Sequence, residues 1–104
     1  MASRAIALGY ACNFRYHTHV NATQRKTLAA LFARPTRGDV RWPDIEVLFR
    51  SLGADISEGA GSRVRVALNG VRAIFHRPHP QKEVKKYAVE SVRDFLKEAG
   101  IRPD

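Results

Sequence analysis

The chain has 104 residues, which is enough for one hydrophobic core and too few for two, so a single domain is expected. Its hydrophobic content of 44% and charged content of 27% exclude a disordered chain, and no stretch is long and apolar enough to span a bilayer. The 18 Lys and Arg residues outnumber the 10 Asp and Glu residues, and the resulting net charge of +8 favours an anionic partner such as nucleic acid.

Residues 1–20 have neither helical nor strand periodicity, and we interpret them as a disordered leader or an over-long gene start. Cys12, His17 and His19 fall short of the four ligands of a structural zinc site, so we expect no metal and no cofactor. The single cysteine cannot form an intramolecular disulfide and does not require an oxidising compartment, which makes the cytoplasm the expected location. Residues 21–104 are expected to form one domain.

Two helices are predicted at the start of this domain. The first lies in "NATQRKTLAALFARP", where Asn21 and Gln24 have the spacing of a capping box. The second lies in "WPDIEVLFRSLG", with Pro43 near its start and Gly53 as its stop. Its apolar residues recur at i, i+3, i+4 and i+7 and predict a buried stripe of Ile45, Leu48, Phe49 and Leu52.

Three strands are predicted next, beginning with a short one in "ADISEG". Asn69-Gly70 is the two-residue turn of a β-hairpin, and a turn of this length places Leu68 opposite Val71 and Arg63 opposite His76. Strand alternation then puts the apolar residues of the hairpin on one face, namely Val64, Val66, Leu68, Val71, Ala73 and Phe75. The other face carries Arg63, Arg65, Arg72, Ile74 and His76.

The longest predicted helix runs from residue 81 to residue 99 and ends at Gly100. Its apolar stripe consists of Val84, Tyr87, Ala88, Val92, Phe95, Leu96 and Ala99. The predicted order is therefore α-α-β-β-β-α. This order indicates an α+β domain with a small three-stranded antiparallel sheet and its helices on one face.

Basic residues concentrate between positions 61 and 86, where seven Lys and Arg residues accompany Glu83 alone. A run of charge is often only a solvated face, but this concentration favours a surface that binds an anion. The candidate RNA-binding residues in this segment are Arg65, Arg72, Arg77, His79, Lys82, Lys85 and Lys86. Three of them, Lys82, Lys85 and Lys86, are expected in the first turns of the last helix, where backbone amides favour phosphate.

Metal-free cleavage of RNA needs a base for the 2′-hydroxyl, an acid for the leaving oxygen and positive charge on the phosphate. His76 beside Arg63 supplies the minimum, since histidine titrates near neutral pH and arginine stays charged. The alternative is an exposed strand histidine with a solvated neighbour. The sequence contains no glycine-rich phosphate loop, CxxC pair, HExxH motif or nucleophile elbow.

The segment from Trp42 to Ile101 contains an amphipathic helix ending in "LG", the motif "GSR", a following hairpin, the strand end "RPHP", and a last helix ending in "FLKEAGI". In the order and spacing of these features it resembles the HicA family of type II toxin-antitoxin systems, which usually has Gly-Ser-His in place of "GSR". The resemblance implies a fold like a double-stranded-RNA-binding domain and a ribosome-independent mRNA interferase that a HicB-like antitoxin neutralises. It also adds Ser62 to the candidate RNA-binding residues.

One position departs from the family pattern, because the histidine of the Gly-Ser-His motif is Arg63 in this chain. The hairpin register places His76 directly across from it, so the imidazole is predicted to come from the neighbouring strand and His76 and Arg63 are the candidate catalytic residues. Two alternatives to an endonuclease stay open. One is a non-catalytic RNA-binding module, and the other is an interaction protein whose basic face binds an acidic antitoxin.

Overall fold

The computed structural model describes residues 20–103, which form three helices and one three-stranded antiparallel sheet. In chain order the elements are α2 (Ala22–Phe32), α3 (Trp42–Ser51), β1 (Asp55–Glu58), β2 (Arg63–Leu68), β3 (Val71–His76) and α4 (Lys86–Glu98). The α-α-β-β-β-α order and the α+β class are thus confirmed. Residues 1–19, with Cys12, His17 and His19, lie outside the described part of the chain. Within that part, no helix is long and apolar enough to cross a membrane.

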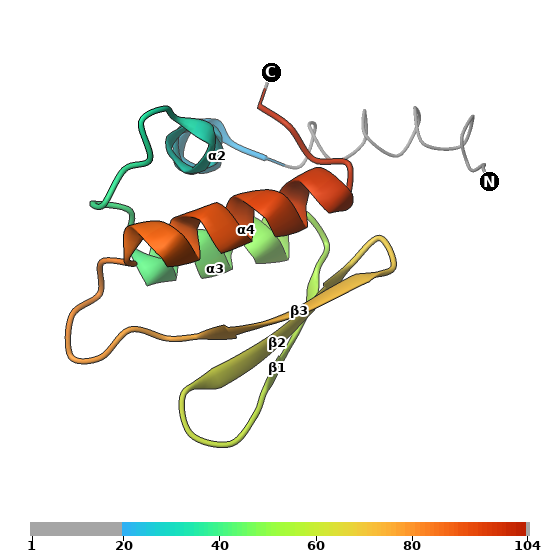
Figure 1. The fold of residues 1–104 in the computed structure, drawn as a ribbon. Coiled ribbons are helices and arrows are strands. Elements are labelled where there is room, and N and C mark those ends of the chain that lie inside the picture. The colour runs from blue at the N-terminus through green and yellow to red at the C-terminus, as the bar shows by residue number, and fades with distance from the viewer. Residues whose placement is uncertain (1–19, 104) are drawn as a thin grey trace.

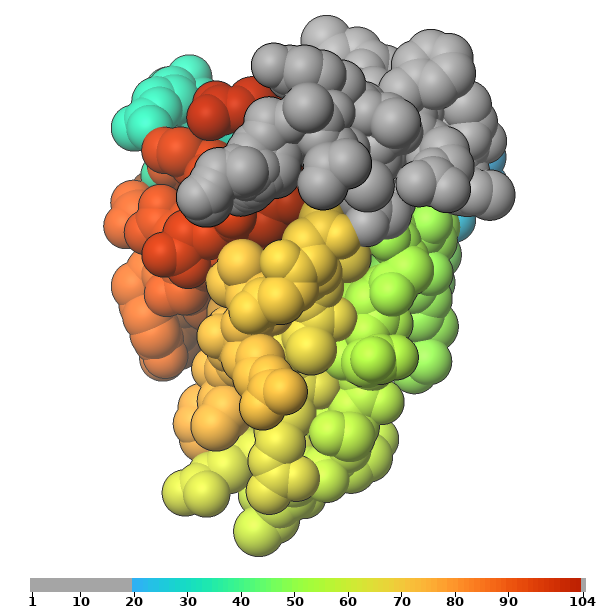
Figure 2. All heavy atoms as spheres, turned by 90° about the vertical axis from the view of Figure 1, so that its right-hand side faces the viewer, coloured from blue at the N-terminus to red at the C-terminus, as the bar shows by residue number. Residues whose placement is uncertain are grey.

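The helices lie on one face of the sheet in two layers (Figure 1). α3 packs against β1 and α4 packs against β3, while α2 lies on the outer side of both helices and contacts each of them. Figure 2, which views the molecule from the side of the β2–β3 turn, shows the hairpin in yellow and orange between α4 and the green segment of α3 and β1. No helix of the described residues covers the other face of the sheet.

α2 begins at the predicted capping box. The side-chain oxygen of Asn21 accepts a hydrogen bond from the backbone N–H of Gln24 at 2.9 Å, and the side chain of Gln24 accepts one from the N–H of Asn21 at 3.0 Å. Val20, which the sequence analysis grouped with the leader, is only 5% exposed and belongs to the hydrophobic core. The folded domain therefore includes Val20.

Arg93 of α4 joins α2 to the rest of the domain. It is 4% exposed, and it donates from Nε to the carbonyl of Leu31 at 2.8 Å and from Nη2 to Oγ1 of Thr36 at 3.0 Å. The last carbonyls of a helix carry partial negative charge and lack helical partners, so a buried guanidinium satisfies and stabilises them. The outer helix is held by a specific polar contact as well as by apolar packing.

The β2–β3 turn has the geometry that its sequence predicts. Asn69 has φ +53° and Gly70 has φ +83°, the two positive values that a type I′ turn requires. Every pair from the turn outward matches the predicted register, and Arg63 is paired with His76 at the far end. Asn69 also donates from Nδ2 to the carbonyl of Ala99 at 2.7 Å, which attaches the turn to the end of α4.

Packing of aromatic rings fixes the direction of the site residues. Phe75 of β3 stacks on Phe49 of α3 with 5.9 Å between ring centroids, and it meets Phe95 of α4 edge-on at 5.7 Å. Successive residues of a strand point to opposite faces of the sheet. Because Phe75 is buried beneath the helices, the next residue, His76, points to the uncovered face and is exposed.

The start of the last helix was predicted five residues too early, because α4 begins at Lys86. The preceding residues form a bridge to the segment before α3: the carbonyl of Lys82 accepts from the N–H of Trp42, and the N–H of Val84 donates to the carbonyl of Val40, both at 2.8 Å. Lys82 therefore lies in an extended segment and not in a helical turn. Val84 is buried as predicted, but through this bridge and not on a helix face.

Candidate functional site

The uncovered face of the sheet brings together four of the predicted site residues, Arg63, Arg65, Arg72 and His76. We call it the open face; it comprises Asp55, Ser57, Arg63, Arg65, Ala67, Arg72, Ile74 and His76. These positions alternate with the buried residues of the same strands, as a sheet covered on one side requires. Three arginines face a single carboxylate here, so the open face has a positive balance of charge.

Arg63 and His76 form the row of the open face that lies farthest from the turn. The loop before β2 holds Arg63 from two sides, since the N–H of Gly59 donates to its carbonyl at 2.9 Å and its own N–H donates to the carbonyl of Ala60 at 3.3 Å. Gly61 has φ +64°, a conformation that other residues adopt only at a cost, which explains the glycine of the "GSR" motif. Ser62 is exposed in the same loop, and its carbonyl accepts a backbone hydrogen bond.

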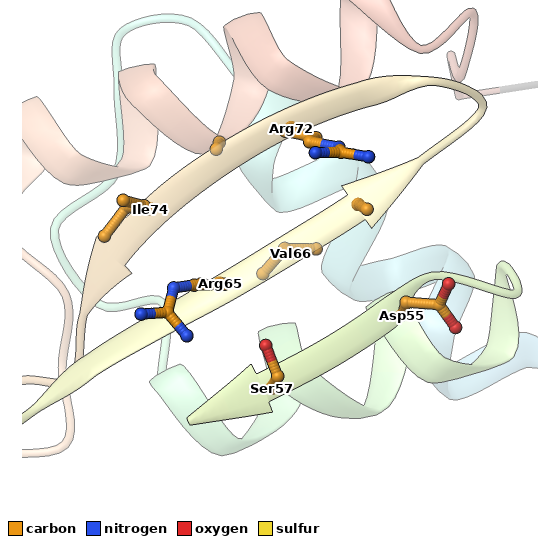
Figure 3. Close-up of a pocket in the computed structure, with 8 residues that line it drawn as sticks. Asp55, Ser57, Arg65, Val66, Arg72 and Ile74 are labelled. Atoms are coloured by element: carbon orange, nitrogen blue, oxygen red, sulfur yellow. The ribbon is translucent and has the colours of Figure 1, made fainter. Parts of the chain in front are cut away.

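A groove of about 590 Å³ crosses the middle of the open face. Figure 3 shows its labelled side chains along the three strands, with Ser57, Arg65 and Ile74 in one row and with Asp55 and Arg72 nearer the turn. Ile74 is 58% exposed, so the groove offers apolar contact between two guanidinium groups. Such a surface suits an anionic partner that also carries flat or apolar groups.

Arg77 differs from the other predicted cations because two carboxylates bind it. Its guanidinium donates to both carboxylate oxygens of Glu58 at 2.9 Å and contacts Oε2 of Glu46 at 2.7 Å. These hydrogen bonds raise the pKa of Arg77 above its usual value and lower the pKa of Glu58 below its usual value. Glu46 also accepts from Nε1 of Trp42 at 2.9 Å. The charge of Arg77 is therefore engaged in holding β1, β3 and α3 together.

A second pocket, of about 200 Å³, lies where β3 ends and α4 begins; we call it the strand-end pocket. His76, His79 and Lys85 line it together with Tyr87. The structure thus brings His79 and Lys85, which belong to the connection between β3 and α4, to the same pocket as His76. The side chains of Lys82 and Lys86 are exposed and do not line this pocket.

Sequence reasoning missed two parts of this site. Tyr87 was assigned to the buried stripe of the last helix, but it is 71% exposed. The helix buries Val92 and Leu96 as predicted, but also Val89, which the predicted stripe left out, and Tyr87 lies on the side away from these residues. The binding of Arg77 by carboxylates was also missed, since Glu46 and Glu58 are distant in sequence and no spacing rule links them to it.

Comparison with known proteins identifies part of the chain. The family model described as HicA toxin of bacterial toxin-antitoxin matches residues 42–101, which is more than half of the sequence and covers both pockets. The match begins at α3 and leaves α2 outside it. No curated protein and no solved structure matches the chain. Within residues 20–103, no group of three or more His, Cys, Asp or Glu side chains could hold a metal ion.

Proposed function

The chain belongs to the HicA toxin family of bacterial toxin-antitoxin systems, and we propose that it is an mRNA endonuclease that acts in the cytoplasm without a metal or the ribosome. Membership of the family implies a cognate antitoxin, and we propose one of the HicB type. The open face and the strand-end pocket are the proposed RNA-binding surface. Arg65 and Arg72 contact phosphates on the sheet, and Ser62, His79, Lys82, Lys85 and Lys86 contact them around its end.

The observation that carries this proposal is the pairing of Arg63 with His76 on adjacent strands. His76 takes the proton from a 2′-hydroxyl, and the 2′ oxygen attacks the adjacent phosphorus. The bond from phosphorus to the 5′ oxygen breaks, and that oxygen takes up a proton from solvent or from the second imidazole of the pocket, His79. Arg63 stabilises the extra negative charge of the pentacoordinate phosphate. The products are a 2′,3′-cyclic phosphate and a 5′-hydroxyl.

His76→Ala is the direct test of this mechanism. The rate of cleavage of purified RNA in the presence of a chelator should fall about 10²- to 10⁴-fold, because a general base is lost. The free energy of unfolding of the variant should lie within about 0.5 kcal/mol of the wild-type value, since the side chain is exposed and makes no core contact. It should still bind antitoxin and no longer arrest growth. For comparison, His79→Ala removes the second imidazole of the pocket, and we expect a smaller loss, because His79 lies beyond the paired strand and solvent can supply the leaving-group proton in its place. A folded His76→Ala protein that cleaves RNA at the wild-type rate would exclude His76 as the base.

A second candidate function is a module that binds RNA or antitoxin without cleaving RNA. Arg63 favours it, because the family motif has histidine at this position. Arg63→His rebuilds that motif and separates the two candidates. If wild type is inactive on RNA and Arg63→His gains cleavage, the chain is a binding module that lost its catalytic histidine. If wild type cleaves RNA and His76→Ala does not, it is an endonuclease.

A further inference from the structure

Tyr87 has an unusual environment for an aromatic side chain. It is the most exposed large apolar residue of the described chain, at 71%, and it lies in the first turn of α4. The ring of Tyr87 is not part of the hydrophobic core. The core cluster contains Val84, Val89 and Val92, which precede and follow Tyr87 in the sequence, but not Tyr87 itself. Single exposed apolar residues are common on proteins, so exposure alone assigns no role to Tyr87. The neighbours of the ring provide the second observation.

The strand-end pocket brings an aromatic residue together with two histidines and a lysine. Tyr87 lines it together with His76, His79 and Lys85, and Pro78 and Ala88 supply apolar wall. Its volume of about 200 Å³ suits one planar ring system and not a folded segment of polypeptide. A flat aromatic surface beside cationic groups is the combination that binds a base and its phosphate in single-stranded nucleic acid.

We propose that Tyr87 is a stacking platform for one unpaired nucleobase beside the scissile phosphate, so that the enzyme selects single-stranded RNA. This inference rests on the proposed RNA-cleaving function and deepens it. A base inside a duplex already stacks on its neighbours and cannot place its face on Tyr87. His79 and Lys85 contact the phosphates on either side of the bound base. Tyr87 acts as a positioning residue and takes no part in proton transfer.

A binding experiment separates this role from catalysis. The probe is a single-stranded oligonucleotide with one 2-aminopurine, and full 2′-O-methylation prevents attack by the 2′ oxygen. Stacking on Tyr87 should quench the 2-aminopurine fluorescence when the full-length wild-type protein binds. Tyr87→Phe should preserve quenching and affinity, because the aromatic face remains. Tyr87→Ala should abolish quenching and weaken binding about tenfold or more.

Two controls isolate the ring. Val47→Ala removes another exposed apolar side chain, 48% exposed on α3, and should leave quenching unchanged. The same oligonucleotide annealed to its complement should bind with no dependence on Tyr87. Because Tyr87→Ala removes no charge, the salt dependence of its residual binding should match that of wild type.

The outcomes distinguish the platform from the proposed function. Equal quenching and affinity for wild type and Tyr87→Ala would overturn the platform and leave RNA cleavage intact. Loss of antitoxin binding in Tyr87→Ala with unchanged RNA binding would overturn it in favour of a protein contact. Quenching that depends on Tyr87 in a protein that does not cleave unmodified RNA would support the platform and reject the endonuclease. A wild-type protein that does not bind the probe would reject both.

Discussion

Arg77 has the same charge as Arg63 and Arg65 but a different role, because its environment differs. Two carboxylates from β1 and α3 accept its hydrogen bonds, and its backbone N–H donates to the carbonyl of Ser62 at 3.0 Å. Arg63 and Arg65 are exposed on the open face. A guanidinium that already has its donors satisfied gains little from a phosphate, whereas an exposed one gains a new charge-assisted contact. The same side chain therefore stabilises the fold at one position and is available to a ligand at its neighbours.

Glu58→Gln should make stability less dependent on pH. Hydrogen bonds from Arg77 lower the pKa of Glu58 from its ordinary value of 4.5, so the unfolded state binds a proton at a higher pH than the folded state does. The stabilisation is present above the unfolded pKa and is lost as pH falls through the folded pKa. Urea midpoints should therefore be lower for Glu58→Gln than for wild type at pH 7 and should converge below pH 4.5. The control is Glu98→Gln, an exposed carboxylate on α4. If the difference in urea midpoint between wild type and Glu58→Gln grew as the pH fell, the stabilising role of the Glu58–Arg77 ion pair would be contradicted.

The hairpin is the element on which the site depends. Its turn sets the register, the register places Arg63 opposite His76, and burial of Phe75 sets which face His76 occupies. A shift of one residue would exchange the two faces of β3 and bury the imidazole. The turn is thus a determinant of the site, although it lies at the other end of the strands.

Gly70→Ala should destabilise the domain by about 1 to 2 kcal/mol, since an L-residue at φ +83° is strained. An added Cβ at this position meets no atom within 4 Å, so the cost is conformational and not steric. Gly38→Ala is the matched control. Its Cβ would lie 3.5 Å from Cε of Lys86, an ordinary contact, and its φ is not positive. Urea denaturation should show a loss only for Gly70→Ala, and equal losses in the two variants would contradict the turn assignment.

Across the whole molecule, the distribution of charge indicates where nucleic acid would bind, which the net charge alone does not. The chain has a net charge of +8, and the segment from residue 61 to residue 86 supplies most of the excess. Part of that segment is neutralised by the ion pairs of Arg77, while the cations of the open face and of the start of α4 remain exposed. A uniformly basic protein attracts nucleic acid at any orientation, whereas a localised excess orients the encounter toward one surface.

Replacing Lys85 and Lys86 with alanine should reduce the slope of log affinity against log salt by about one to two units. The variant neutralises fewer phosphates, so its binding releases fewer counterions. The measurement is RNA binding titrated at several salt concentrations. The double variant Lys26→Ala, Lys97→Ala removes the same charge from α2 and from the other end of α4 and should leave the slope nearly unchanged. Equal changes in both variants would indicate binding through net charge alone.

Local sequence patterns predict the order of the elements, the hairpin register and the two faces of β2 and β3. These features depend on local rules: a capping box at Asn21, positive φ at Asn69 and Gly70, and alternation along a strand. The predicted pairing of Arg63 with His76 followed from these rules, and the structure has that pairing. The family resemblance that supplied the expected chemistry was likewise readable from short motifs, and the family match confirms it.

Three other features follow from the packing of the folded chain: where α4 begins, which side of it Tyr87 occupies, and what Arg77 binds. Each depends on segments that are distant in the chain. Hydrogen bonds between residues 82–84 and residues 40–42 replace the first helical turns, and the helix that remains buries Val89 and exposes Tyr87. Glu46 and Glu58 reach Arg77 only because α3 packs beside β1. Local periodicity cannot encode such contacts, since their energy arises only after the elements have come together.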